Sequence, residues 1–244
     1  MNRFFIKKTD IEGECARVGG EDARHISSVL RMARGDEAVL CDAKGTDYFA
    51  RIEKIEKEHI LFHILSSKPC EAEPAAHVTL YQGLPKAGKL ESIIQKCVEL
   101  GVSRVVPVLA KRSVVRLTKK EFEKKLPRYQ RVAYEAAKQC GRGIVPEVCG
   151  LVGVEEIDPA AYDAFFMPYE GEREATFKKA LRAADKRGTA AVLIGPEGGF
   201  DAAEAKLLRD KGALSVTLGP RILRTETAGP AVLAMLLYEW EGDA

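Results

Sequence analysis

The sequence has no apolar run long enough to cross a bilayer, and it has no segment with the features of a secretory signal. Its longest apolar stretch, Ala231–Tyr238, is far shorter than the roughly 20 residues that a membrane-spanning helix requires. The first residues, MNRFFIKKTD, lack the long apolar core of a signal peptide. These absences predict a cytoplasmic protein without a membrane partner.

Metal-binding and redox motifs are also missing. The six cysteines never form a C-x-x-C pair, which argues against a zinc knuckle or a redox site and suits reduced thiols. His59 and His63 stand four residues apart, the spacing of metal ligands on a helix, but the surrounding HILFH alternates as a strand does. We therefore expect no metal site.

Neither sign of charge is in large excess, since the formal net charge is only +2. Positive charge is nevertheless concentrated in one region. Between Lys111 and Arg142 there are eleven Lys or Arg residues against three Glu residues. A solvated helix face commonly has this composition. Alternatively, the region is a surface that neutralises the phosphates of a nucleic acid. Both interpretations remain open from composition alone.

The chain changes character near residue 70. Before it, segments 37–42, 46–55 and 59–65 alternate as strands joined by tight turns, which predicts a small antiparallel sheet or barrel. One amphipathic helix is expected over about 21–34. Its apolar stripe consists of Ala23, Ile26, Val29, Leu30 and Ala33. Residues 66–77, SSKPCEAEPAAH, form a proline-containing linker and the best domain boundary.

After the linker, strands alternate with helices. Strands are predicted at 77–84, 103–110, 163–168, 189–195 and 214–219. Helices are predicted near 90–101, through a basic region to about 140, near 173–187, at 201–212 and at 227–240. This alternation predicts an α/β domain with a mostly parallel sheet. The last helix is apolar on almost every side through Leu237, so the core or another subunit must cover it.

Three glycine-containing loops follow predicted strands. The first, GLPKAGKL, nearly fits the phosphate-loop pattern. However, Leu90 replaces the hydroxyl residue that would hold Mg²⁺, and Pro85 removes a backbone donor. A nucleotide-triphosphate site is therefore disfavoured, and Lys86 and Lys89 remain available for RNA phosphates.

The second loop, in LIGPEGGF, ends a buried strand, which is where ligands bind in open α/β sheets. Its carboxylate, Glu197, would repel a polyphosphate, which favours a ligand with a cationic or neutral polar part. Alternatively, Glu197 only accepts hydrogen bonds from backbone N–H groups at a helix entry.

The third loop, LGPRILRTETA, turns at Gly219 and Pro220 and leads into the last helix. Thr225 or Thr227 could cap this helix, with Pro230 in its first turn. Two irregular loops that end adjacent strands would form one cleft. Apolar side chains and free backbone groups there suit a flat adenine.

Together, LIGPEGGF and LGPRILRTETA resemble the paired signatures of the uridine-N3 ribosomal RNA methyltransferase family (RsmE-like) of the SPOUT superfamily. The stretches KLESIIQKCVELGV, EAAKQCGRGIVPEV and HISSVLRMARGD are similar to other parts of this family. The resemblance implies a PUA-like RNA-binding β-barrel over 1–70 and a SPOUT α/β domain with a deep trefoil knot over 75–244. It further implies the cofactor S-adenosylmethionine, N3-methyluridine in 16S ribosomal RNA as the product, and a homodimer through the knotted domain. The RNA partner would be 16S ribosomal RNA or the small ribosomal subunit.

The resemblance also assigns residues. The expected cofactor-binding residues are Leu84, Leu193, Ile194, Gly195, Pro196, Glu197, Gly198, Gly199, Leu218, Gly219, Ile222, Leu223, Thr227 and Ala228. The expected RNA contacts are Arg3, Arg24, Arg31, Lys86, Arg112, Arg116, Gln139 and Arg142.

Methylation of uracil N3 requires an unpaired base and the loss of its imide proton. Arg224 or Arg221 could stabilise the developing anion while water takes the proton. Glu197 and Glu226 are alternative general bases, or only a loop brace and a helix cap. A methyltransferase acting on a ribose 2′-hydroxyl or on transfer RNA, a nucleotide hydrolase and a non-catalytic RNA-binding module remain alternatives.

Overall fold

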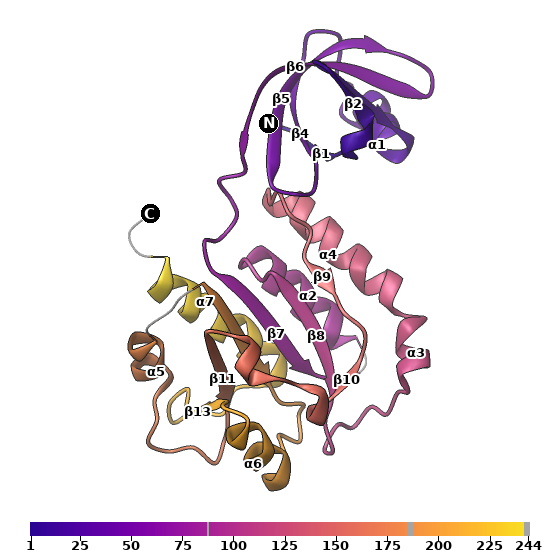
Figure 1. Cartoon of the computed structure of the whole chain (residues 1–244). Coiled ribbons are helices and arrows are strands. Elements are labelled where there is room, and N and C mark those ends of the chain that lie inside the picture. Colours follow the sequence, from indigo (N-terminus) through magenta and orange to yellow (C-terminus); the bar gives the residue numbers. More distant parts are fainter. Residues whose placement is uncertain (87, 185–187, 242–244) are drawn as a thin grey trace. The chain divides into compact units, whose positions relative to one another are not determined.

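The computed structural model describes residues 1–86, 88–184 and 188–241 (Figure 1). The chain forms two compact units. The first consists of Met1–Glu73 with Ala137–Val145, and the second of Pro74–Ala136 with Pro146–Ala244. The sequence patterns do not indicate that Ala137–Val145 returns to the first unit. Among the described residues, no helix combines the length and hydropathy needed to span a membrane.

A curled six-stranded sheet forms the first unit (Figure 1). Its strand order is β1-β4-β5-β6-β3-β2, with β1 and β4 parallel and the other pairs antiparallel. Alternation in the strands directs side chains such as Phe4, Leu40, Ile52 and Phe62 into one core. The elements are β1 (Arg3–Phe5), β2 (Ile11–Glu12), β3 (Cys15–Gly19), α1 (Gly20–Arg24), β4 (Glu37–Cys41), β5 (Thr46–Ile55) and β6 (His59–Pro69). The predicted strands of this region are confirmed, but β6 continues to Pro69, so residues 66–69 of the predicted linker belong to this strand.

The helical segment after β3 is shorter and less regular than its periodicity predicts. The helix α1 continues into a π-helical turn, His25–Val29, after which Arg31 has a φ of 51°. Ala23 and Ile26 are buried as predicted, but Val29 is 66% exposed. The prediction of a helix to residue 34 is therefore wrong at its end. A π-helical turn departs from the 3.6-residue spacing on which the apolar stripe depends.

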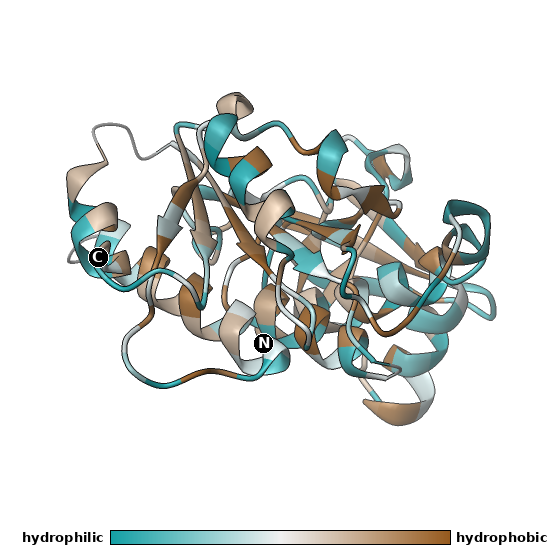
Figure 2. Cartoon of the chain, turned by 90° about the horizontal axis from the view of Figure 1, so that it is seen from below, coloured by the Kyte–Doolittle hydropathy of each residue, from teal (hydrophilic) through white to brown (hydrophobic). Residues whose placement is uncertain are grey.

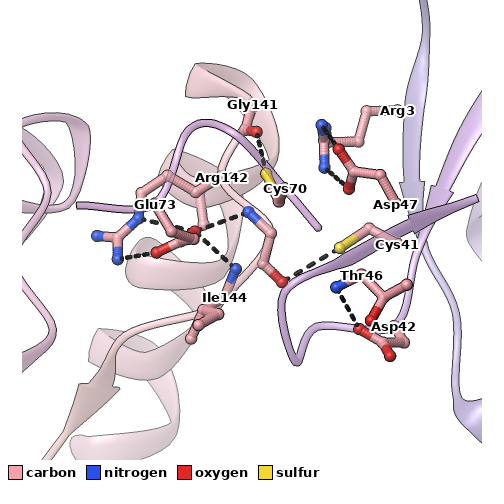
Figure 3. Close-up of polar contacts among 12 residues, drawn as sticks. Arg3, Cys41, Asp42, Thr46, Asp47, Cys70, Glu73, Gly141, Arg142 and Ile144 are labelled. Atoms are coloured by element: carbon pink, nitrogen blue, oxygen red, sulfur yellow. Dashed lines mark hydrogen bonds and ion pairs between the residues drawn. The ribbon is translucent and has the colours of Figure 1, made fainter. Parts of the chain in front are cut away.

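A buried ion pair fastens Ala137–Val145 to the rest of the first unit (Figure 3). The Arg142 guanidinium, in a residue only 3% exposed, donates to Glu73 Oε2 at 2.7 Å. Glu73 Oε1 also accepts from the backbone N–H groups of Gly143 at 2.8 Å and Ile144 at 2.9 Å. A buried charge is tolerated only when it is paired and hydrogen-bonded in this way. Arg142 is therefore an internal structural residue of this unit rather than a surface group.

The second unit is built on a seven-stranded parallel sheet of order β10-β8-β7-β12-β11-β13, with β9 also paired to β8. Hydrophobic colours predominate along its central strands in Figure 2, as is typical of strands buried on both faces. The sheet confirms the predicted parallel α/β architecture. From residue 77, the strands are β7 (His77–Gly83), β8 (Arg104–Leu109), β9 (Glu147–Val148), β10 (Val152–Gly153), β11 (Ala164–Pro168), β12 (Thr189–Ile194) and β13 (Leu214–Val216).

Helices cover both faces of this sheet. They are α2 (Lys89–Glu99), α3 (Lys119–Glu123), α4 (Leu126–Cys140), α5 (Phe177–Ala183), α6 (Ala202–Asp210) and α7 (Thr225–Trp240). Phe165 and Leu193 pack in the same cluster as Leu208 of α6, whereas Phe166 contacts Trp240 of α7. Neighbouring residues of β11 therefore face opposite layers. The predicted long basic helix is in fact α3 and α4, and residues 111–118 precede them as a loop.

The C-terminal helix α7 packs against α2, α5, β7 and β12. It starts at Thr225, and neither threonine caps it, because Arg224 holds the N-cap position without a side-chain cap bond. Pro230 lies in the second turn rather than the first. The apolar composition of α7 is only partly buried, since Tyr238 is 86% exposed and Met235 41% exposed.

Candidate functional site

A cavity of about 430 Å³ lies at the carboxyl ends of β11, β12 and β13. The loops that follow these three strands line it, together with the first turn of α7. Parallel strands present their loops at one edge of the sheet, and ligands of open α/β sheets bind at that edge. The volume is within the range of small-molecule sites in proteins.

Two of the loops are those that carry the sequence motifs. The expected cofactor residues that line the cavity are Ile194, Gly195, Pro196, Glu197, Gly199, Leu218, Gly219, Ile222, Leu223 and Ala228. Arg221 and Arg224 line it as well. Leu84 and Leu193 are instead buried in the core, and Gly198, Thr227 and Glu226 are not among the lining residues.

The loop after β11 is the third wall of the cavity. It contributes Pro168, Tyr169, Glu170 and Arg173, none of which belongs to a sequence motif. These residues directly follow a correctly predicted strand of the same parallel sheet, so the rule that ligands bind at carboxyl ends could have indicated them. The cavity thus has carboxylates on the loops after β11 and β12, and arginines on the loops after β11 and β13.

Residues 195–199, which follow β12 and form the glycine-rich loop, are in close contact with the neighbouring strand β7. A Cβ atom on Gly83, the last residue of β7, would lie 2.4 Å from the backbone nitrogen of Pro196. Gly199 adopts a φ of +66° and donates its N–H to the Pro196 carbonyl at 2.9 Å. Only glycine allows such an approach and tolerates such a φ without strain. These two glycines therefore serve the close packing of backbone segments.

A buried hydrogen-bond relay joins three segments beside the cavity. The fully buried Gln82 donates from Nε2 to Thr225 Oγ1 at 2.8 Å. The Thr225 hydroxyl in turn donates to the Gly195 carbonyl at 2.7 Å. The end of β7, the glycine-rich loop and the start of α7 are thereby held together.

Lys89, the first residue of α2, lies between the two carboxylates that were candidate bases. Its Nζ is 3.2 Å from Glu197 Oε1 and 3.1 Å from Glu226 Oε1. Glu197 Oε1 also accepts the backbone N–H of Lys86 at 3.1 Å. Lys86 and Lys89, in the segment that nearly fits the phosphate-loop pattern, thus bind one carboxylate of the loop after β12 and one in the first turn of α7.

Both carboxylates are held in their ionised form. Burial alone would raise the pKa of Glu197, but hydrogen bonds from the Lys86 N–H, its own N–H and Lys89 outweigh burial and lower it. The pKa of Glu226 is lowered by its own backbone N–H and by Lys89. A carboxylate with a lowered pKa is a weaker base. The geometry therefore favours bracing roles for Glu197 and Glu226.

The expected RNA-contacting residues fall into two groups. Arg3 and Arg142 are paired inside the first unit, Arg3 with both oxygens of Asp47 at 2.6 and 2.7 Å (Figure 3). The exposed group consists of Arg24, Arg31, Lys86, Arg112, Arg116 and Gln139. Within the exposed group, Arg112 Nη1 lies 3.5 Å from the carbonyl oxygen of Gly198. Residues 111–118, which form the basic loop, therefore lie against the glycine-rich loop of the cavity.

Comparison with known protein families matches both parts of the chain. Residues 71–237 match an RNA methyltransferase domain, and residues 18–65 match an RNA methyltransferase PUA domain. The chain is 34% identical to ribosomal RNA small subunit methyltransferase E of Bacillus subtilis, over 99% of this chain and 98% of the relative. It is 30% identical to the protein of the same name from Mycobacterium tuberculosis, over 99% of this chain and 94% of that one.

Solved structures give the same result. Ribosomal RNA small subunit methyltransferase E from Neisseria gonorrhoeae, bound to S-adenosyl methionine, superposes with a TM-score of 0.83 at 31% identity, over 98% of each chain. A putative methyltransferase from Legionella pneumophila in complex with the same cofactor gives a TM-score of 0.82 at 28% identity. It covers 97% of this chain and 96% of its own.

The buried relay predicts the effect of one isosteric substitution. Thr225→Val removes a hydroxyl that both accepts from Gln82 and donates to Gly195. We expect the free energy of unfolding to fall by about 1–3 kcal/mol, because buried polar groups lose a partner. Urea unfolding measures this change. The matched control is the exposed Thr227→Val, which should stay within about 0.5 kcal/mol of the unchanged protein. Equal effects of the two substitutions would contradict the role of the relay.

Proposed function

Because the chain belongs to the ribosomal RNA small subunit methyltransferase E family, we propose that it uses S-adenosylmethionine to methylate N3 of a uridine in 16S ribosomal RNA. The observation that carries this proposal is the cavity at the carboxyl ends of β11, β12 and β13, which the two motif loops build. Relatives of the same fold are bound to S-adenosylmethionine in their structures. Ribosomal RNA as the substrate would place the activity in the cytoplasm.

The residues that line the cavity fit this cofactor. Ile194, Phe200, Leu218 and Leu223 provide apolar surface for an adenine ring. Glu170 presents a carboxylate to a ligand that carries a sulfonium and an ammonium group, whereas the carboxylate of Glu197 is already bound by Lys89 and the Lys86 N–H. Gly195 and Gly199 have no side chains, so the backbone of this loop can lie close to the ligand. A nucleotide hydrolase is disfavoured, because Leu90 stands where a phosphate loop has the hydroxyl residue that holds Mg²⁺.

The bound cofactor would supply a methyl carbon already activated by its sulfonium. The residues of this chain must then align the uracil ring with that carbon and exclude water. Negative charge develops on the ring as N3 gives its proton to a water molecule, and we propose that Arg224 stabilises this charge through a carbonyl oxygen. Arg224 stands directly before α7, next to the anchored Thr225, so the helix N-terminus adds its positive dipole end. Arg221 lies in the middle of the loop without such an anchor.

A direct assay tests the reaction and the choice of arginine. We expect the protein to methylate small-subunit RNA from cells that lack it, and mass mapping should locate the methyl group on N3 of one uridine. Arg224→Met should lower kcat on the order of 100-fold, because one charge-stabilising donor is removed from the reacting ring, while Arg221→Met should lower it less. A methyl group on a ribose 2′-hydroxyl, or on transfer RNA, would contradict the proposed substrate. Equal losses in the two variants would contradict the assignment of Arg224.

The RNA would be bound by the exposed basic loop beside the cavity. Residues 111–118 lie against the glycine-rich loop through Arg112, and Arg116 donates to the carbonyl of Lys111. Phosphate contacts in this position would bring a single-stranded target base to the cofactor. The PUA domain of the first unit supplies a second surface, with Arg24 and Arg31 exposed.

The salt dependence of RNA binding tests the basic loop. Replacing both Arg112 and Arg116 by Ala should weaken binding and reduce the slope of log K against log salt by about 2, roughly one for each lost phosphate contact. Filter binding over a range of salt concentrations measures the slope. Lys178→Ala removes an exposed charge from α5 and serves as the control. An unchanged slope in the double variant would remove these arginines from the proposed RNA surface.

We also propose the knotted topology and the homodimer that the family resemblance implies. The chain leaves the sheet at the edge strand β13 and returns to its centre as α7, which packs on β7, β12 and α2. A knot requires in addition that this segment pass through a loop of the chain. A backbone that straightens completely when both ends are pulled would contradict the knot. For the dimer, α7 carries Met235 and Tyr238 on its exposed side, and Ile222 is 85% exposed. Such apolar groups favour a covered interface.

Introducing charge on α7 tests the dimer. The double substitution Met235→Glu and Tyr238→Glu should convert a dimer into a monomer, because two desolvated carboxylates oppose association. Light scattering after size exclusion measures the mass. Val29→Glu alters an exposed apolar residue of the first unit and should leave the dimer intact. A monomeric unchanged protein, or a dimeric double variant, would contradict the proposed interface.

A further inference from the structure

Carboxylates and arginines meet at the same end of the parallel sheet. Glu197 lines the cavity together with Arg221 and Arg224. Within the described part of the chain, the guanidinium groups of both arginines make no ion pair or hydrogen bond. The carboxylates of Glu197 and Glu226 are both bound by Lys89 instead. This division of partners leaves Arg224 available to a ligand.

We propose that Lys89 is a positioning residue that keeps Arg224 unpaired by engaging the carboxylate of Glu226. The proposal rests on the proposed methyl transfer, in which Arg224 stabilises negative charge on the target base. Lys89 itself is placed on α2, at a distance in sequence from both partners, and does not line the cavity. Its effect on the reaction is therefore exerted through Glu226 and Arg224.

Glu226 is the carboxylate that the loss of Lys89 would release. Glu197 is 14% exposed at its side chain and keeps a second donor, the Lys86 N–H at 3.1 Å. The Glu226 side chain is 31% exposed and depends on Lys89 and on its own backbone N–H. Arg224, two residues earlier in the chain, already acts on Glu226 electrostatically, since its charge adds to the backbone and Lys89 effects that lower the Glu226 pKa.

A released Glu226 would compete with the substrate for Arg224. Arginine and carboxylate form bidentate, charge-assisted hydrogen bonds, and these strengthen where solvent is excluded. An arginine paired in this way has its donors occupied and its charge compensated, so it stabilises a developing anion poorly. Lys89 prevents this pairing because its ammonium group lies within 3.1 Å of Glu226 Oε1.

The test combines single and double substitutions in the full-length protein. Lys89→Met should lower kcat by up to about 100-fold, because a released Glu226 would occupy Arg224, the charge-stabilising donor, with little change in cofactor affinity measured by calorimetry. Adding Glu226→Gln to Lys89→Met should restore most of kcat, because a neutral amide does not compensate the charge of Arg224. Lys89→Arg should stay near the unchanged protein, since it preserves the ion pairs. Lys96→Met, at an exposed position of the same helix, is the control.

The outcomes separate this inference from the proposed function. Recovery of kcat in the Lys89→Met/Glu226→Gln variant supports the inference, because a merely structural Lys89 would not be compensated by removing its partner. A double variant as inactive as Lys89→Met overturns it, and so does a Lys89→Met variant that no longer binds S-adenosylmethionine. If the unchanged protein binds the cofactor but transfers no methyl group to ribosomal RNA, the proposed function fails instead.

Discussion

The hydroxyl of Thr225 is the point at which the cavity is held together. It accepts from Gln82 at the end of β7 and donates to Gly195 after β12, while its own backbone begins α7. These segments come from three distant parts of the chain, and β7 and β12 are neighbours only because of the strand order of the parallel sheet. The lack of a side chain on Gly83 lets the glycine-rich loop approach β7 closely enough for the relay to form. The shape of the cavity thus depends on backbone packing as much as on its lining side chains.

Charge at this edge of the sheet is arranged so that Lys89 binds the carboxylates of Glu197 and Glu226, while Arg221 and Arg224 stay unpaired among the described residues. Nearby carboxylates stabilise a methyl donor with a sulfonium group, whereas nearby cations stabilise a uracil that loses its N3 proton. If the two sets of side chains paired with one another, neither would serve its ligand. Lys89 keeps Glu226 from pairing with Arg224 by binding its carboxylate. The backbone N–H of Lys86 likewise binds the carboxylate of Glu197. A lysine outside the cavity therefore has a place in the electrostatics of the reaction.

Most of the fold could be predicted from the sequence because its signals are local. Period-two alternation marks β4, β5 and β6, and continuous apolar runs mark β8 and β12. Prediction fails where local rules compete with packing. The π-helical turn at His25–Val29 exposes a residue of the apolar stripe, and the Thr225 hydroxyl bonds a distant carbonyl instead of capping its own helix. The return of Ala137–Val145 to the first unit depends on Glu73, a contact across about seventy positions that no periodicity encodes.

Prediction of the site from sequence fails for the same reason, and the basic residues are the clearest example. Sequence composition treats Arg3, Arg142 and Arg112 alike, yet two are bound by internal carboxylates and only Arg112 lies exposed beside the cavity. The segment 83–90, which nearly fits the phosphate-loop pattern, suggests a phosphate site for a related reason. Its glycine and lysine are real structural requirements, but Gly83 accommodates Pro196, and Lys89 binds carboxylates. A short motif reports that a backbone needs freedom and that a cation is present. Only the neighbouring strand determines whether that cation faces a phosphate or the protein's own acids.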